Sequence, residues 1–180
     1  SIVSAVYLFT RDRVLLNESI FMKRSVLYAA DMNIPEDVNA LDAVYTERVR
    51  EVRDKESGTV RYYRISNKQG ELAGYVLPFS GPGLWGEIQA VIGFTPGLDS
   101  LTGLDFVKQN ETPGLGARIT EEWFKEQFRG GQGPFALVAE GMGDAANEMD
   151  AITGATRTSA YVQELINSAV SRAPEIVEGS

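Results

Sequence analysis

The spacing of apolar residues alternates along the chain between a helical period and a strand period, and it is helical near both ends. Residues 10–32 have the helical period and end before Pro35, and residues 159–172 have it again. The apolar positions of these two segments are Val14, Ile20, Phe21, Leu27 and Tyr28, then Tyr161, Val162, Leu165, Ile166, Ala169 and Val170. The pattern therefore predicts a helix near each end of the chain.

Short alternating runs between these helices predict strands. Residues 43–53 form one run, and residues 59–66 form a second one after the turn at Ser57-Gly58, so the two predict a β-hairpin. Three further runs are joined by glycine-rich segments: residues 71–79, 87–95 and 101–109. We expect these runs to pair as an antiparallel or mixed sheet.

The last third of the chain adds one helix and one strand. Residues 118–128 place apolar side chains near one helical face and end at a GGQG segment, and residues 134–140 supply the strand. The pattern predicts an α+β fold, a single domain with a twisted antiparallel or mixed sheet flanked by helices. We expect residues 1–35 to form an N-terminal helical segment and residues 36–180 to form the main domain.

Composition excludes several kinds of chemistry. The chain has no cysteine and no histidine, which excludes disulfides, iron–sulfur clusters, thiolate zinc sites, histidine-ligated haem and the Ser-His-Asp triad. Redox or transfer chemistry would therefore depend on an organic cofactor, or on carboxylates with a hard cation. The net charge of −8 leaves no basic stripe for phosphates, so we expect no nucleic-acid partner.

The first nine residues, SIVSAVYLF, are mostly apolar and are followed by Arg11 and Arg13. This stretch is shorter than the roughly 20 apolar residues of a membrane span. Two interpretations stay open: the stretch is the end of a membrane anchor, or it is a short strand or the first turns of an amphipathic helix.

Two glycine-rich segments are candidate binding loops. Residues 80–86, SGPGLWG, allow a sharp turn that presents Leu84 and Trp85, although Trp85 could equally pack into the core. Residues 110–116, NETPGLG, place Glu111 and Thr112 before a Pro-Gly turn and a predicted helix. Backbone N–H groups there could face an anionic or carbonyl-rich ligand, and an ordinary turn with a helix cap is the alternative.

The third candidate is DAITGATRTS, residues 150–159, directly before the last helix. Hydroxyls before a helix are usually caps, and Thr158 and Ser159 are the better candidates for that role. Caps do not account for four hydroxyls around the small Gly154-Ala155 step. A helix start with spare hydroxyls is suited to a phosphate, so Thr156 and Thr153 are candidate ligands.

The DAITGATRTS segment resembles the flavinylation motif Asp-x-x-[Ser/Thr]-Gly-Ala-Thr of the FMN-binding domain family. SGPGLWG and NETPGLG resemble two further segments of that family, in the same order. The family includes subunits of sodium-translocating NADH:quinone reductases and of the related Rnf ferredoxin:NAD complexes. The resemblance implies that residues 36–180 are an FMN-binding domain with FMN joined to Thr156 through a phosphoester by a separate flavin transferase.

The resemblance, taken with the loop positions, yields a set of expected cofactor-binding residues and neither a catalytic residue nor a metal site. Asp150 matches the leading acid of the motif, and Thr153 stands where Ser is common. The expected FMN-binding residues are Thr156, Thr153, Gly154, Ala155, Thr158, Leu84, Trp85, Glu111, Thr112, Gly114, Leu115 and Gly116. We expect the three loops to converge on one cleft, with Leu84, Trp85 and Leu115 against the flavin ring.

Three classes of function follow. The first is an electron-carrier subunit of a membrane NADH:quinone or ferredoxin:NAD oxidoreductase, with the other subunits as partners. The resemblance then implies an N-terminal membrane helix outside this chain and a place on the extracytoplasmic, periplasmic face. The second class is an exported FMN-dependent reductase with its own small substrate. The third is a flavin-free extracytoplasmic binding module.

Overall fold

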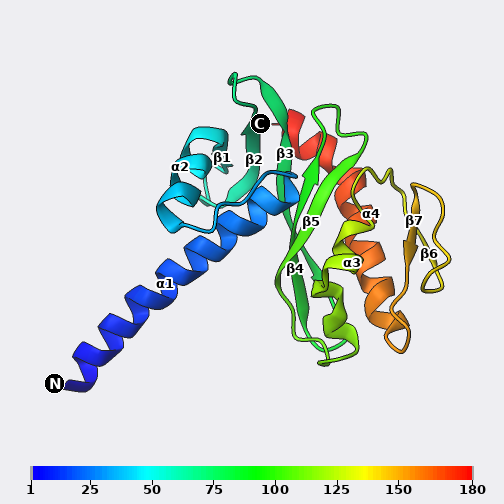
Figure 1. Ribbon diagram of the computed structural model, residues 1–180, viewed down its shortest axis with the longest axis horizontal. Coiled ribbons are helices and arrows are strands. Elements are labelled where there is room, and N and C mark those ends of the chain that lie inside the picture. The colour runs from blue at the N-terminus through cyan, green and yellow to red at the C-terminus, as the bar shows by residue number, and fades with distance from the viewer. Residues whose placement is uncertain (1, 180) are drawn as a thin grey trace.

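A twisted antiparallel sheet of five strands lies between two groups of helices in the computed structural model (Figure 1), which describes residues 2–179 and the side chains of residues 16–179. The strands pair in chain order, each with the next. They are β1 (Val49–Arg53), β2 (Val60–Ser66), β3 (Leu72–Pro82), β4 (Glu87–Phe94) and β5 (Leu101–Lys108). The α+β fold, the β1–β2 hairpin and the three following strands are confirmed.

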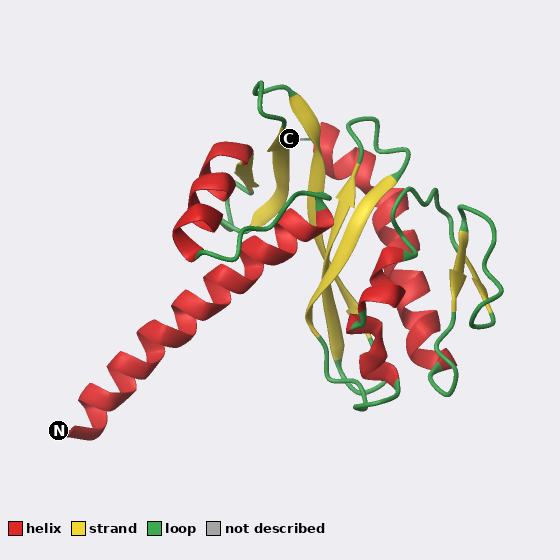
Figure 2. Cartoon of the chain, in the orientation of Figure 1, coloured by secondary structure: helices red, strands yellow, loops and turns green. Residues whose placement is uncertain are grey.

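Helices cover both faces of the sheet (Figure 2). On one face lie α3 (Glu122–Glu126) and the long C-terminal helix α4 (Thr156–Glu178). On the other face lie α2 (Val38–Arg48) and the last turns of α1 (Ile2–Ala29), whose N-terminal part extends away from the sheet (Figure 1). The sheet is therefore the middle layer of three.

The period of two along each strand divides the core into two clusters. Tyr62 of β2 belongs to the cluster that includes residues of α4 and α3, whereas its neighbour Tyr63 belongs to the cluster that includes residues of α1 and α2. The same alternation separates Leu77 from Val76 on β3. Strands that are apolar on both sides require helices on both faces, which accounts for the three layers.

The last turn of α1 lies directly on the sheet because glycine stands at two paired positions, Gly93 and Gly103. A Cβ at Gly93 would overlap the carbonyl oxygen of Ala29, and one at Gly103 would lie 3.0 Å from it. The same carbonyl accepts a hydrogen bond from Thr102 Oγ1 at 2.7 Å. The sheet thus satisfies a carbonyl that the end of a helix leaves free.

A second contact joins α1 to α3. The Tyr28 hydroxyl donates to Glu126 Oε1 at 2.5 Å, and its ring lies 4.1 Å from Lys125 Nζ and 4.7 Å from the Arg129 guanidinium carbon. Burial, with the Glu126 carboxylate, raises the pKa of Tyr28 above its usual value, so this hydroxyl stays a donor. The C-terminal end of α1 is therefore held by both the sheet and α3.

Several sequence predictions need correction. Residues 43–48 belong to α2, because Asp37 caps that helix by accepting from the Ala40 N–H at 2.9 Å, and Leu41 and Tyr45 share its buried side. Residues 118–128 do not form one helix: extended Glu121 separates a 3₁₀ turn, η1 (Gly116–Thr120), from α3. The last helix begins at Thr156, earlier than predicted.

The strand predicted at residues 134–140 is short, β6 (Ala136–Val138), and it stands outside the main sheet. It pairs in parallel with β7 (Glu148–Asp150), which the sequence pattern did not indicate. The two strands lie beside α4 (Figure 1). β7 leads directly into the segment before α4, so this ribbon determines how the chain enters that helix.

Within the described part of the chain, no helix combines the length and the apolar character that a membrane crossing requires.

Replacing Gly93 by Ala should lower the free energy of unfolding by about 1–3 kcal/mol, because the new methyl group would displace the last turn of α1. Gly97→Ala is the control, since its Cβ would meet Asp99 Oδ1 at an ordinary 3.4 Å. Chemical denaturation measures both. Equal stability of the two variants would show that α1 does not depend on this close approach.

Candidate functional site

A pocket of about 350 Å³ lies at the start of α4, and all three candidate loops contribute to it. Ligand sites in proteins commonly measure about 300–1,000 Å³. The lining residues are Leu84, Glu111, Thr112, Leu115, Gly116, Gly154, Ala155, Thr156, Arg157 and Thr158. The expected convergence of the three segments on one cleft is confirmed.

The antiparallel pairing of the sheet accounts for this convergence. Pro82 at the end of β3 pairs with Glu87 at the start of β4, and Gln89 of β4 pairs with Lys108 at the end of β5. The turn between β3 and β4 and the segment after β5 therefore leave the sheet at the same end. The start of α4, which packs across β3, completes the group.

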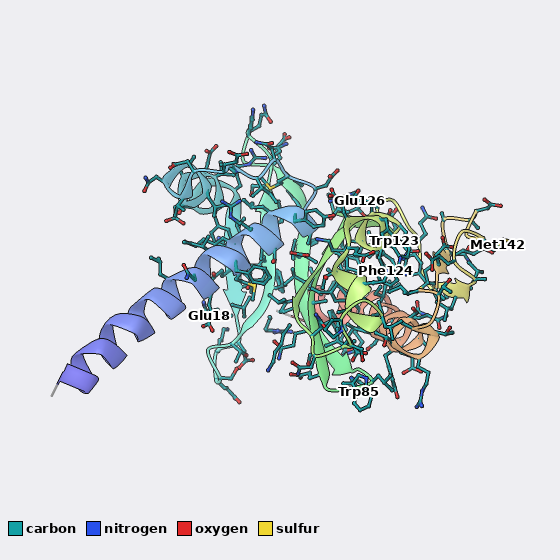
Figure 3. All side chains as sticks on the ribbon, turned by 60° about the horizontal axis from the view of Figure 1, so that its bottom comes forward. Glu18, Trp85, Trp123, Phe124, Glu126 and Met142 are labelled. Atoms are coloured by element: carbon teal, nitrogen blue, oxygen red, sulfur yellow. The ribbon has the colours of Figure 1, made fainter. Side chains whose placement is uncertain are left out.

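The loop between β3 and β4 is a tight turn in which the Gly83 N–H donates to the Gly86 carbonyl at 2.6 Å. Leu84 and Trp85 form its tip. Leu84 lines the pocket, whereas Trp85 is 67% exposed and is not among the lining residues. Figure 3 shows Trp85 projecting from the end of the sheet. The alternative in which Trp85 packs into the core is wrong.

The segment after β5 turns back on itself at Thr112, whose carbonyl accepts from the N–H groups of Leu115 and Ala117 at 3.1 Å each. Gly114 has φ +73°, which this turn requires and which residues with a Cβ rarely adopt. The turn leaves Leu115 44% exposed beside the pocket. Gly114 itself lies outside the lining, so its contribution is to the turn.

Thr156 is the first residue of α4 and its side chain is exposed. The first backbone bond of the helix runs from the Ser159 N–H to the Ala155 carbonyl at 3.1 Å. The N–H groups of Thr156, Arg157 and Thr158 therefore precede the helical ladder, and no side chain caps them. This end of the helix offers backbone donors and a positive dipole end to an anion in the pocket.

Thr158 and Ser159 are not caps, which corrects the sequence prediction. Both are buried and use their hydroxyls elsewhere. Ser159 Oγ accepts from the Ile152 N–H at 2.9 Å and donates to the Ala155 carbonyl at 3.1 Å. These bonds fix the chain just before the helix instead of satisfying its free N–H groups.

Thr158 Oγ1 donates to the carboxylate of Glu111 at 2.6 Å. Glu111 is only 5% exposed, and its other oxygen accepts from the Trp85 N–H at 3.1 Å. Both residues were expected to contact the cofactor. In the structure, each oxygen of the Glu111 carboxylate is already bonded within the protein.

Asp150, the leading acid of the motif, has a structural role. Asp150 accepts from the N–H groups of Gly141 and Gly143, at 2.8 Å each, and so closes the loop between β6 and β7. Thr153 lies outside the lining residues, and its N–H donates to Glu140 Oε2 at 2.7 Å. This bond lowers the pKa of Glu140.

Sequence reasoning missed Arg157 as a site residue. It lies inside the motif and lines the pocket, where it supplies a positive charge next to Thr156. The signal was present, because an arginine stands between two threonines at the predicted start of a helix. Within residues 16–179, no group of three or more acidic side chains is placed to hold a metal ion.

Comparison with known proteins matches residues 83–171 to the FMN-binding domain family. The chain is 34% identical to a subunit of the ion-translocating oxidoreductase complex of Methanosarcina acetivorans, over 67% of this chain and 62% of that protein. It is also 34% identical to a subunit of the Na(+)-translocating NADH-quinone reductase of Neisseria meningitidis, over 56% of this chain and 42% of that protein. The matched region thus spans about half the length of these relatives.

Solved structures show the same fold. A crystal structure of a Na(+)-translocating NADH-quinone reductase subunit from Parabacteroides distasonis superposes with a TM-score of 0.73 at 26% identity, covering 92% of this chain and 96% of that one. NqrC from Shewanella oneidensis gives a TM-score of 0.70 at 22% identity, covering 83% and 90%.

Replacing Asp150 by Ala should free the loop between β6 and β7, because two backbone N–H groups lose their acceptor. We expect faster cleavage of residues 139–147 by a broad-specificity protease, followed by mass spectrometry. Asp144→Ala removes a carboxylate from the same loop without removing those two bonds. Equal cleavage of both variants would contradict the structural part given to Asp150.

Proposed function

Because the chain belongs to the FMN-binding domain family, we propose that it is an electron-carrying subunit of a membrane NADH:quinone or ferredoxin:NAD oxidoreductase, with FMN attached to Thr156. The observation that carries this proposal is the exposed hydroxyl of Thr156 at the first position of α4, inside a pocket formed by all three motif loops.

The residues present fit the two chemically different parts of FMN. The free N–H groups at the start of α4 and the guanidinium of Arg157 suit the phosphate. Leu84 and Leu115 offer apolar surface to a planar ring. When bound, FMN supplies the electron transfer, and the chain sets its position and surroundings.

The attachment itself requires a second protein. A phosphoester would form when the Thr156 oxygen bonds to the phosphorus of a flavin donor as the bond from that phosphorus to the donor's leaving group breaks, and the hydroxyl proton would pass to a base. Among the residues that line the pocket, the titratable side chains are Glu111 and Arg157. Glu111 is engaged with Trp85 and Thr158, so we assign the base for this step to a flavin transferase.

The partners we propose are the other subunits of such a complex, since both relatives compared above are named as subunits of ion-translocating or Na(+)-translocating oxidoreductases. We further propose that α1 continues from a membrane helix N-terminal to Ser1 and that the domain lies on the extracytoplasmic face. The apolar start of the chain and the extension of α1 away from the sheet support the membrane helix (Figure 1). The extracytoplasmic face is proposed from the resemblance to the FMN-binding domain family.

Replacing Thr156 by Ala should give a folded protein that takes up no covalent flavin, because an exposed side chain contributes little to stability. The measurement is intact mass and in-gel flavin fluorescence after co-expression with a flavin transferase. Thr153→Ala is the matched control and should stay fluorescent, and Arg157→Gln should label more slowly. A fluorescent Thr156→Ala band with the flavin mapped to another hydroxyl would show the assignment to be wrong.

Localisation can be tested in cells that express the full-length protein. We expect it in the membrane fraction, and we expect protease added to spheroplasts to cleave its domain while a cytoplasmic marker stays intact. Protection of the domain until the membrane is lysed would place it on the opposite face. Recovery in the soluble fraction would rule out the anchor.

A further inference from the structure

The buried carboxylate of Glu111 is the point where the three loops of the site meet. Its Oε1 accepts from the backbone N–H of Trp85, and its Oε2 accepts from the hydroxyl of Thr158. These partners lie 26 and 47 residues away in the sequence. One side chain therefore joins the tip of the β3–β4 turn to the first turn of α4.

The surrounding backbone leaves room for this carboxylate and for little else. A Cβ at Gly83 would lie 2.6 Å from Glu111 Oε1. A Cβ at Gly116 would lie 2.9 Å from Glu111 Oε2 and 2.7 Å from Thr158 Oγ1. Glycine in each of the two flanking loops thus allows the loops to close on the charged group.

The two bonds depend on each other because the group they share is a buried carboxylate. A carboxylate removed from water requires hydrogen-bond donors, and loss of one donor leaves charge that is not compensated. The start of α4 adds a favourable field, since its dipole is positive at the end where Thr158 lies. Loss of the Thr158 hydroxyl should therefore weaken the hydrogen bond from the Trp85 N–H to Glu111.

We propose that Glu111 and Thr158 are positioning residues that hold the Leu84–Trp85 tip and the Thr156 helix start in one arrangement before the cofactor is attached. They act on each other and not on the flavin. The bonds themselves belong to the protein without flavin, whereas their consequence for attachment rests on the proposed function of Thr156.

Hydrogen exchange of the Trp85 amide in the flavin-free protein tests the pair directly. Thr158→Val keeps the shape of the side chain and removes the donor, and Glu111→Gln removes the charge. We expect each to speed exchange of this amide by about tenfold or more, while amides of the β4 core such as Val91 keep their rate. The double variant should exchange no faster than the faster single one, because both changes break the same connection.

Two control variants separate positioning from loss of structure. Thr158→Ser restores the hydroxyl and should return Trp85 exchange close to that of the unchanged protein. Thr112→Val removes a hydroxyl from the same pocket without touching either bond, and the Trp85 amide should not respond. If Glu111→Gln does not fold, comparison of Thr158→Val with Thr158→Ser still tests whether the Thr158 hydroxyl controls exchange of the Trp85 amide.

Attachment supplies the second measurement. With a purified flavin transferase and its flavin donor, Thr158→Val should label about tenfold or more slowly, and Thr158→Ser should label at close to the unchanged rate. Unchanged Trp85 exchange in Thr158→Val, or effects of the two substitutions that multiply, would overturn the proposal. Flavin on Thr156→Ala would overturn the proposed function and leave the exchange result standing.

Discussion

Burial of one side of α4 against the sheet is the constraint on which the site depends. Val162, Ile166, Ala169 and Ala173 of this helix are fully buried, and they pack with apolar side chains from β2 to β5. Because α4 is fixed along its length, its first residue is fixed at the end of the sheet where β3 turns into β4 and β5 ends. An exposed threonine at that position is held in place by packing well away from it.

The same sheet separates the two parts of the chain to which we assign a function, the cofactor pocket on one face and the helix α1 on the other. The pocket is built from α4 and the loops on its side, whereas α1 is held from the opposite face by Gly93, Gly103 and Thr102. A close-packed middle layer is stiff, so the direction of α1 and the position of Thr156 are linked through it. A carrier that passes electrons between fixed partners would benefit from such a link.

The sequence was sufficient for the sheet strands and the three loops, because alternation and glycine-rich motifs are local signals. The sequence was insufficient where tertiary contacts determine which secondary structure a segment adopts. Residues 43–48 alternate like a strand, yet the Asp37 cap and the buried pair Leu41 and Tyr45 make them helical. Two separate motifs placed Glu111 and Thr158 among the expected cofactor-binding residues, and both line the pocket. No local pattern indicates that they bond to each other across 47 residues.

The proposed function and the proposed positioning role together require that the pocket at the start of α4 holds FMN on Thr156 while Glu111 keeps its two protein bonds. A crystal structure of the flavin-loaded chain would test this most directly. We expect continuous density from Thr156 Oγ1 to the phosphate, an isoalloxazine ring against Leu84 and Leu115, and Glu111 still bonded to Trp85 and Thr158. Density that begins at another hydroxyl, or a flavin bonded to Glu111 in place of those donors, would contradict it.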